Sequence, residues 1–330
     1  MTLSIILFCV GLVCLIKGGD WFVDGSCGIA KRFHIPEIII GATIVSIGTT
    51  LPEVMVSATS AVSGHSEIAY GNALGSIICN TSLIAAMSIA IKPSKAPRKP
   101  LIIPIIAFFA SAIIYSVVSY TTGYFSRPLG ICLLCLFVGY MALTVIQATK
   151  APALEPVTAE DESQHSSEDE NKSSVLWKEI FFLIIGATLI AIGAKLLVDH
   201  GTIIATELGV PESVIALTFV ALGTSLPELV TSITALVKGH SSLSLGNIIG
   251  ANLFNLVLVS GVSIALSPFS IPENSTIAGI NTSLIIDIPV MFTVMLILTV
   301  PTLIRGKLSR WQGFLLLAIY AGFCALQFSL

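Results

Sequence analysis

Residues 36–55 read PEIIIGATIVSIGTTLPEVM, and residues 211–230 read PESVIALTFVALGTSLPELV. A shift of 175 residues places the second stretch on the first. The register holds without a gap over residues 36–80 and 211–255, where 20 of 45 positions are identical. The identities include Pro, Gly, Glu, His and Asn, which shared hydrophobicity alone would not match. The chain therefore contains two copies of one structural unit.

The composition indicates a membrane protein. Of the 330 residues, 55% are hydrophobic and only 11% are charged, with a mean hydropathy of +0.95; a soluble domain carries about a quarter charged residues. Apolar runs of roughly 20 residues, the length that crosses a hydrocarbon core as a helix, recur along the chain. The first lacks the basic flank of a signal peptide, so we expect it to be retained. We expect ten spans, at about 2–23, 37–63, 67–91, 101–120, 128–149, 176–198, 212–237, 242–266, 280–304 and 311–329.

Each copy holds five spans, an odd number, so two copies with one fold must have opposite polarity in the membrane. The predicted fold is an all-α polytopic membrane protein whose ten transmembrane helices form two inverted five-helix repeats. The repeats cover residues 1–149 and 176–330, joined by an acidic cytoplasmic linker at 150–175. Of the loop Lys and Arg residues, thirteen lie in one set of alternate loops and only Arg127 in the other. This asymmetry predicts both termini outside a cell inner (plasma) membrane and the linker inside.

The repeated motif places a carboxylate in the middle of an apolar span, at Glu53 and at Glu228. A carboxylate at that depth costs at least about 2.5 kcal/mol, so it needs a partner. Thr49 and Thr50 lie four and three residues before Glu53, on the same helix face. Pro52 lacks the amide that would bond the carbonyl four residues earlier. Hydroxyl, carbonyl and carboxylate oxygens suit hard cations such as Na⁺, Ca²⁺ or Mg²⁺. The alternative is a simple helix start or capping box.

The next span of each copy carries an amide stripe. Its polar positions are Asn72, Ser76 and Asn80 in the first copy and Asn247, Ala251 and Asn255 in the second. Beside the stripe, each span has a face of small residues that permits another helix to approach closely. This face is formed by Gly71 and Gly75 in the first copy and by Gly246 and Gly250 in the second. Asn80 and Asn255 are candidate ligands, with hydrogen bonds between helices as the alternative.

Other polar residues have structural interpretations. Glu37 and Glu212 follow a proline at a helix start and are expected to be caps. His65 and His240 follow glycine and are expected to be turn residues, with proton sensing as the alternative. Three acidic side chains complete the set: Asp24 and Asp199 at helix ends, expected to be interfacial, and Asp287, which could pair with Lys17 or Lys195. Cys132 and Cys135 form a CxxC motif in mid-span that we expect to be buried packing.

The segments 41–80 and 216–255 resemble the two alpha repeats of the cation/Ca²⁺ exchanger superfamily, specifically the Na⁺/Ca²⁺ exchanger type and its prokaryotic members. The resemblance rests on GTTLPE at 48–53, GTSLPE at 223–228, and GNxxG at 71–75 and 246–250. It extends over the whole chain, because that family also has ten helices in an inverted repeat around a central cytoplasmic loop.

The resemblance implies that Glu53 and Glu228 are the chief Ca²⁺ ligands. The other calcium- or sodium-binding residues it implies are Thr49, Thr50, Thr224, Ser225, Ser76, Asn80 and Asn255, with backbone carbonyls near Ser46 and Ala221. It also implies that the first and sixth helices slide against the rest. The chain departs from common members at Ala251, Ile77 and Asn255, where many have Ser, Asn and, in some, Asp. The missing hydroxyl at Ala251 removes an oxygen from one candidate Na⁺ site.

We therefore predict a secondary active antiporter that exchanges Ca²⁺ for Na⁺ by alternating access through a midplane site. Its partners would be the two ions and the lipid bilayer, with no cofactor, no nucleic acid and a monomeric state. A H⁺-coupled exchanger of Ca²⁺ or another divalent cation is the alternative, because the same carboxylates could carry protons. A cation channel is a further alternative. We do not expect an enzyme, since the sequence has no HExxH or GxSxG motif.

Overall fold

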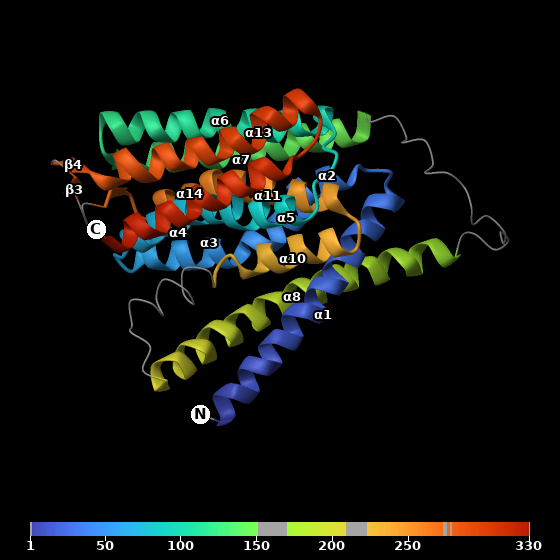
Figure 1. Ribbon diagram of the computed structural model, residues 1–330. Helices are drawn as coiled ribbons and strands as arrows, with labels where there is room; N and C mark the ends of the chain where they lie inside the picture. The colour runs from blue at the N-terminus through green and yellow to red at the C-terminus, as the bar shows by residue number, and fades with distance from the viewer. Residues whose placement is uncertain (1, 151–169, 209–222, 273–275, 278, 330) are drawn as a thin grey trace.

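The computed structural model describes residues 2–150, 170–208, 223–272, 276–277 and 279–329, and within these ranges the chain is almost entirely helical (Figure 1). The first half comprises α1 (Thr2–Arg32), α2 (Glu37–Ile40), η1 (Gly41–Val45), α3 (Ser46–Val62), α4 (Ser66–Cys79), η2 (Asn80–Ala85), α5 (Ala86–Ile91), α6 (Arg98–Thr121) and α7 (Arg127–Lys150). The second half comprises α8 (Glu170–Glu207), α10 (Leu226–Val237), α11 (Ser241–Phe254), η4 (Asn255–Val259), α12 (Ser260–Leu266), η5 (Ser283–Asp287), α13 (Ile288–Arg305) and α14 (Arg310–Ser329).

These helices confirm the predicted all-α polytopic fold. Eight of them, counting continuous runs such as α2 with η1 and α3, are long and apolar enough to cross a membrane. The expected seventh span is described only in part, as the shorter apolar helix α10, because residues 212–222 lie outside the described ranges. Short strands connect the loops beyond the helices: β1 (Tyr124–Phe125) pairs antiparallel with β2 (Phe269–Ser270), and β3 (Thr276–Ile277) with β4 (Ile280–Asn281).

Helices α1 and α8 form a crossing pair at one side of the bundle, away from the layer of α6, α7, α13 and α14 (Figure 1). Glycines line their contact. A Cβ added to Gly11 would lie 3.0 Å from the carbonyl oxygen of Gly193, and one added to Gly18 would lie 2.9 Å from that of Gly186. The repeat shift relates Gly11 to Gly186 and Gly18 to Gly193, so the contact is itself two-fold. Without side chains between them, the two backbones approach closely.

Both of these helices extend beyond the expected spans, which corrects the placement of two acidic residues at helix ends. Asp24 lies within α1, where its carboxylate pairs with Lys238 at 2.8 Å. Asp199 lies within α8 and pairs with Lys195 at 2.9 Å. The Lys195 and Asp199 pair is four residues apart on α8, a spacing that stabilises a helix, whereas the Asp24 pair joins α1 to the residue after α10.

Two further expectations are changed by the structure. Cys132 and Cys135 are exposed on α7, so their predicted burial is wrong. Lipid solvates apolar side chains, and a mid-span thiol therefore need not face the protein interior. Asp287 pairs with neither suggested lysine within the described residues; Gln327 donates a hydrogen bond to it at 2.9 Å.

The centre of the bundle is formed by α3, α4, α10 and α11, and it contains π-helical turns that the sequence did not predict. Asn80 begins η2 and its repeat mate Asn255 begins η4. A side-chain hydroxyl reaches back five residues in two of the π-helical turns: Ser46 donates to the Gly41 carbonyl at 2.7 Å, and Ser260 to the Asn255 carbonyl at 3.1 Å. π-Helical turns occur frequently at functional sites.

Candidate ion-binding site

Glu53 of α3 and Glu228 of α10 meet at the centre of the molecule. Both side chains are completely buried. Among the described residues, three of their four carboxylate oxygens have no hydrogen-bond partner. The fourth, Oε1 of Glu228, accepts a long hydrogen bond of 3.4 Å from Thr50, which belongs to the other repeat. Buried carboxylates are almost always paired or bound to a metal, so these oxygens are suited to hold a cation.

The two copies of the motif differ in local structure. Pro52 lies inside the continuous helix α3, as the expected mid-span position of Glu53 requires. In the second copy, residues 223–225 form a turn and α10 begins at Leu226, which places Glu228 in a first helical turn. In the second copy, as far as it is described, the motif is therefore a helix start, which was the alternative interpretation of the sequence. Proline suits a first turn, where its missing amide leaves no helical bond unmade.

Asn80 and Asn255 extend the buried polar centre. Both are fully buried, and neither side-chain oxygen nor nitrogen has a partner among the described residues. The alternative of hydrogen bonds between helices is realised by a different residue. Asn252 donates to Thr81 across the repeats at 2.7 Å. The amides at 80 and 255 are therefore left available, at the start of the two π-helical turns.

A second pair of asparagines, which the sequence singled out only as members of the stripe, contacts the site. Asn247 accepts from the Thr49 hydroxyl at 3.2 Å, and its backbone carbonyl accepts from Ser46 at 3.0 Å. Its repeat mate Asn72 instead stays within its own half, donating to Ser57 at 2.8 Å. The i, i+8 spacing to Asn80 and Asn255, two helical turns along the same face, was the signal that could have added them to the candidate site. Their different partners show that the repeats adopt different arrangements.

The remaining candidate residues surround this centre. Ser225 is buried, with a hydroxyl that has no partner in the described chain. Ser76 and Thr224 line one cavity, of about 350 Å³. Ala221 lies outside the described residues. Apart from it, the structure brings the expected oxygen-bearing residues of both repeats to one buried region.

The glycine faces of the two repeats differ in packing. A Cβ on Gly250 would lie 2.7 Å from the Cα of Ala42, so the second-copy face is closed by η1. Among the described residues, which do not include the repeat-related segment 216–221, nothing lies within 4 Å of a Cβ on Gly71 or Gly75, and both glycines line the 350 Å³ cavity. An adjoining cavity of about 330 Å³ continues to Asp287. Both cavities lie along α4 and α14, toward the end of the bundle where α4 begins.

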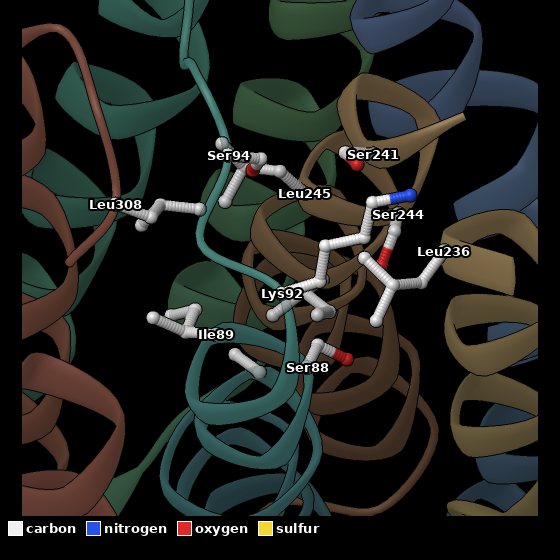
Figure 2. A pocket seen from close by; sticks show the side chains of 11 residues that line it. Ser88, Ile89, Lys92, Ser94, Leu236, Ser241, Ser244, Leu245 and Leu308 are labelled. Atoms are coloured by element: carbon white, nitrogen blue, oxygen red, sulfur yellow. The ribbon is translucent and has the colours of Figure 1, made fainter. Parts of the chain in front are cut away.

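A smaller pocket lies at the opposite end of the described bundle. It is formed between the end of α5 and the start of α11 and has a volume of only about 20 Å³. Figure 2 shows the Lys92 side chain extending across this pocket toward Ser244 of α11, with Leu236 on the same side and Leu308 on the opposite side. The cavities lined by the described residues are therefore larger at one end of the bundle than at the other.

Comparison with known proteins assigns this architecture. The sodium/calcium exchanger protein family matches residues 3–146 and 178–329. The chain belongs to that family. The sodium/calcium exchangers are transporters, and the chain is accordingly an antiporter of this family.

Several relatives share its full length. The putative antiporter CaxA of Alkalimonas amylolytica is 35% identical over 100% of both chains. The sodium/calcium exchanger MaX1 of Methanosarcina acetivorans is 30% identical over 99% of both chains. A solved structure of the sodium-calcium exchanger NCX_Mj soaked with Na⁺ is 32% identical, covers 98% of both chains and superposes with a TM-score of 0.80. At this identity and coverage, the exchanger fold extends over the whole chain.

Proposed function

We propose that this exchanger moves Ca²⁺ against Na⁺ through the buried centre, with Glu53 and Glu228 as the Ca²⁺ ligands. The observation that carries the proposal is a pair of fully buried carboxylates, one from each repeat, of which three oxygens lack any partner in the described chain. The carboxylates of Glu53 and Glu228 are close enough to interact electrostatically. Their mutual repulsion favours the binding of a cation between them.

The ligand chemistry supports Ca²⁺ over other divalent ions. Two carboxylates, the amide oxygens of Asn80 and Asn255, and nearby carbonyls could supply the six to eight oxygens that Ca²⁺ takes. Mg²⁺ retains its water more strongly and demands a stricter octahedron. Thiolate and imidazole, which softer metals prefer, are not among these candidate ligands.

Charge balance supports exchange in preference to leak. Two ionised carboxylates are neutralised by one Ca²⁺ or by two Na⁺, so either loading removes the cost of carrying buried charge. The empty site would keep that cost, because two negative charges would face a medium of low dielectric constant. The hydroxyls of Thr49, Thr50, Thr224, Ser225 and Ser76 and backbone oxygens near Ser46 and Ala221 are the proposed additional Na⁺ ligands.

The unequal ends of the bundle support alternating access. The Lys and Arg asymmetry predicts that the α4 start faces outside, so the arrangement with the larger cavities would be open outward. The pseudo-symmetric opposite arrangement would close the Gly71 and Gly75 face and open that of Gly246 and Gly250. Inverted repeats allow such an interchange with little change inside each half. The proposal also includes a monomer in the plasma membrane with both termini outside.

Proteoliposomes with Na⁺, K⁺ and pH gradients imposed separately test the proposal. We expect ⁴⁵Ca²⁺ uptake only when Na⁺ is high inside and low outside. Uptake driven by a pH gradient without Na⁺ would replace Na⁺ coupling with H⁺ coupling. Flux that needs no counter-ion would indicate a channel and contradict antiport.

A further inference from the structure

We propose that Cys27, Glu37 and His240 form a second cation site, for a borderline-soft divalent metal such as Zn²⁺. Their ligand atoms all lie within 4.8 Å of one another. The His240 Nδ1 and the Glu37 Oε1 are 2.8 Å apart. The three residues come from α1, from the first turn of α2, and from the N-cap of α11, so both repeats contribute.

The ligand set and its spacing suit a tetrahedral metal. Metal bonds of 2.0 to 2.3 Å place tetrahedral ligand atoms roughly 3.3 to 3.8 Å apart. Small rotations of the Glu37 and His240 side chains would bring the present separations to that range. Thiolate with imidazole and carboxylate selects Zn²⁺ or Cd²⁺ over the hard ions Na⁺ and Ca²⁺. Three protein ligands leave the fourth position for water, and the thiol proton would be released on binding.

The three ligands differ in burial, which places one of them in the interior and leaves a path to it from the surface. The Cys27 side chain is buried, whereas the side chains of His240 and Glu37 are 25% and 29% exposed. A metal could therefore reach the thiol from the surface through the other two ligands. The ordinary interpretation of the Glu37 and His240 contact is an ion pair or a cap. That interpretation gives no role to a thiol placed within reach of both.

The surrounding charges permit a cation here. Lys238 is already paired with two carboxylates, Asp24 at 2.8 Å and Asp20 at 3.4 Å. Lys31 is the other lysine that acts electrostatically on the Cys27 thiol, and Glu37 acts in the opposite sense. Two carboxylates, Asp24 and Glu37, and two lysines thus act on the thiol and balance one another. Ionisation of the thiol on metal binding would supply the negative charge that favours a divalent cation.

The site exists at one end of the molecule only. The repeat shift relates Glu37 to Glu212 and His240 to His65, but it relates Cys27 to Thr202. A hydroxyl is a poor ligand for a soft metal. A metal bound to Cys27 would link α1 to α2 and α11 at the end that is closed in this structure. If the proposed exchange requires α1 to move against the core, the bound metal inhibits it; this consequence rests on the proposed function.

Metal binding can be tested without transport, using the full-length protein in detergent and Co²⁺ as the probe. We expect a thiolate-to-Co²⁺ charge-transfer band that Zn²⁺ abolishes. Cys27→Ser should lose the band, and His240→Ala should raise the Kd at least about tenfold. The matched controls, Cys14→Ser in the same helix and His65→Ala at the repeat-related position, should keep it. A missing band in the wild type, or a band unchanged in Cys27→Ser, would overturn the site.

A second arm measures exchange in proteoliposomes stripped with a Zn²⁺-selective chelator. Cys27→Ser should exchange at the wild-type rate, which also shows that it is folded, and added Zn²⁺ should slow the wild type alone. Equal inhibition of both proteins would overturn the regulatory role. A failure of the proposed function would appear differently, as absence of Na⁺-driven exchange in both proteins while the Co²⁺ band remained.

Discussion

Replacing Glu53 or Glu228 by glutamine keeps the side-chain shape and removes one unit of charge. Both side chains are fully buried, and neither carboxylate has a lysine or arginine partner among the described residues. The cation is therefore the group expected to balance their charge. Each substitution halves the negative charge that faces Ca²⁺, and it leaves the second carboxylate in place.

The expected magnitude follows from the burial. Removing one partner of a buried charge pair costs about 3 to 5 kcal/mol. Since about 1.4 kcal/mol corresponds to a tenfold change in affinity, the apparent Ca²⁺ affinity should fall by about a hundredfold to several thousandfold. At micromolar Ca²⁺, such a loss would abolish exchange.

The assay is Na⁺-gradient-driven ⁴⁵Ca²⁺ uptake in proteoliposomes, with equal protein incorporation and intact thermal unfolding verified for each variant. Asp199→Asn is the matched control, because this carboxylate is half-exposed on α8 and pairs with Lys195 away from the centre. It should retain wild-type uptake. Uptake by Glu53→Gln or Glu228→Gln at half the wild-type rate or more would refute the assignment of the two glutamates as the Ca²⁺ ligands.

Three more outcomes are expected. Gly250→Ala should destabilise the detergent-solubilised protein by about 1 to 3 kcal/mol through overpacking against Ala42. A methyl group in its repeat mate Gly75→Ala meets nothing within 4 Å among the described residues, so this variant should unfold at the wild-type temperature. Equal unfolding temperatures of the two variants would contradict the difference in packing. Ser76→Ala should raise the half-saturating Na⁺ concentration several-fold and change Ca²⁺ affinity less; an unchanged Na⁺ dependence would remove this hydroxyl from the Na⁺ ligands. An impermeant thiol reagent added outside should slow exchange by modifying Cys324, which lines the 350 Å³ cavity, and the Cys324→Ser variant should be protected from this inhibition. Inhibition of Cys324→Ser to the wild-type extent, or labelling of Cys324 only by reagent added inside, would contradict the outward opening.

The sequence identified the central residues because the duplication repeats rare polar groups at one spacing. Glu53 and Glu228, with their neighbouring hydroxyls, stand out against apolar spans, and the structure places them in one buried region. The ligand roles themselves stay predictions. Helix ends and surface exposure were less predictable. A cysteine side chain is compatible with both lipid and the protein interior, so the sequence alone does not say which of the two Cys132 and Cys135 face.

What the sequence determined by itself was the duplication, the number of helices per copy, and hence the inverted arrangement, since an odd number of spans reverses polarity. Only the tertiary structure decided how the two copies differ. Near-identical motifs fold differently around Pro52 and Pro227. Among the described residues, the glycine face of the second repeat is packed and that of the first is open. A sequence repeat specifies equivalent local interactions, whereas a single conformation of the molecule satisfies only one of the two equivalent packings at a time.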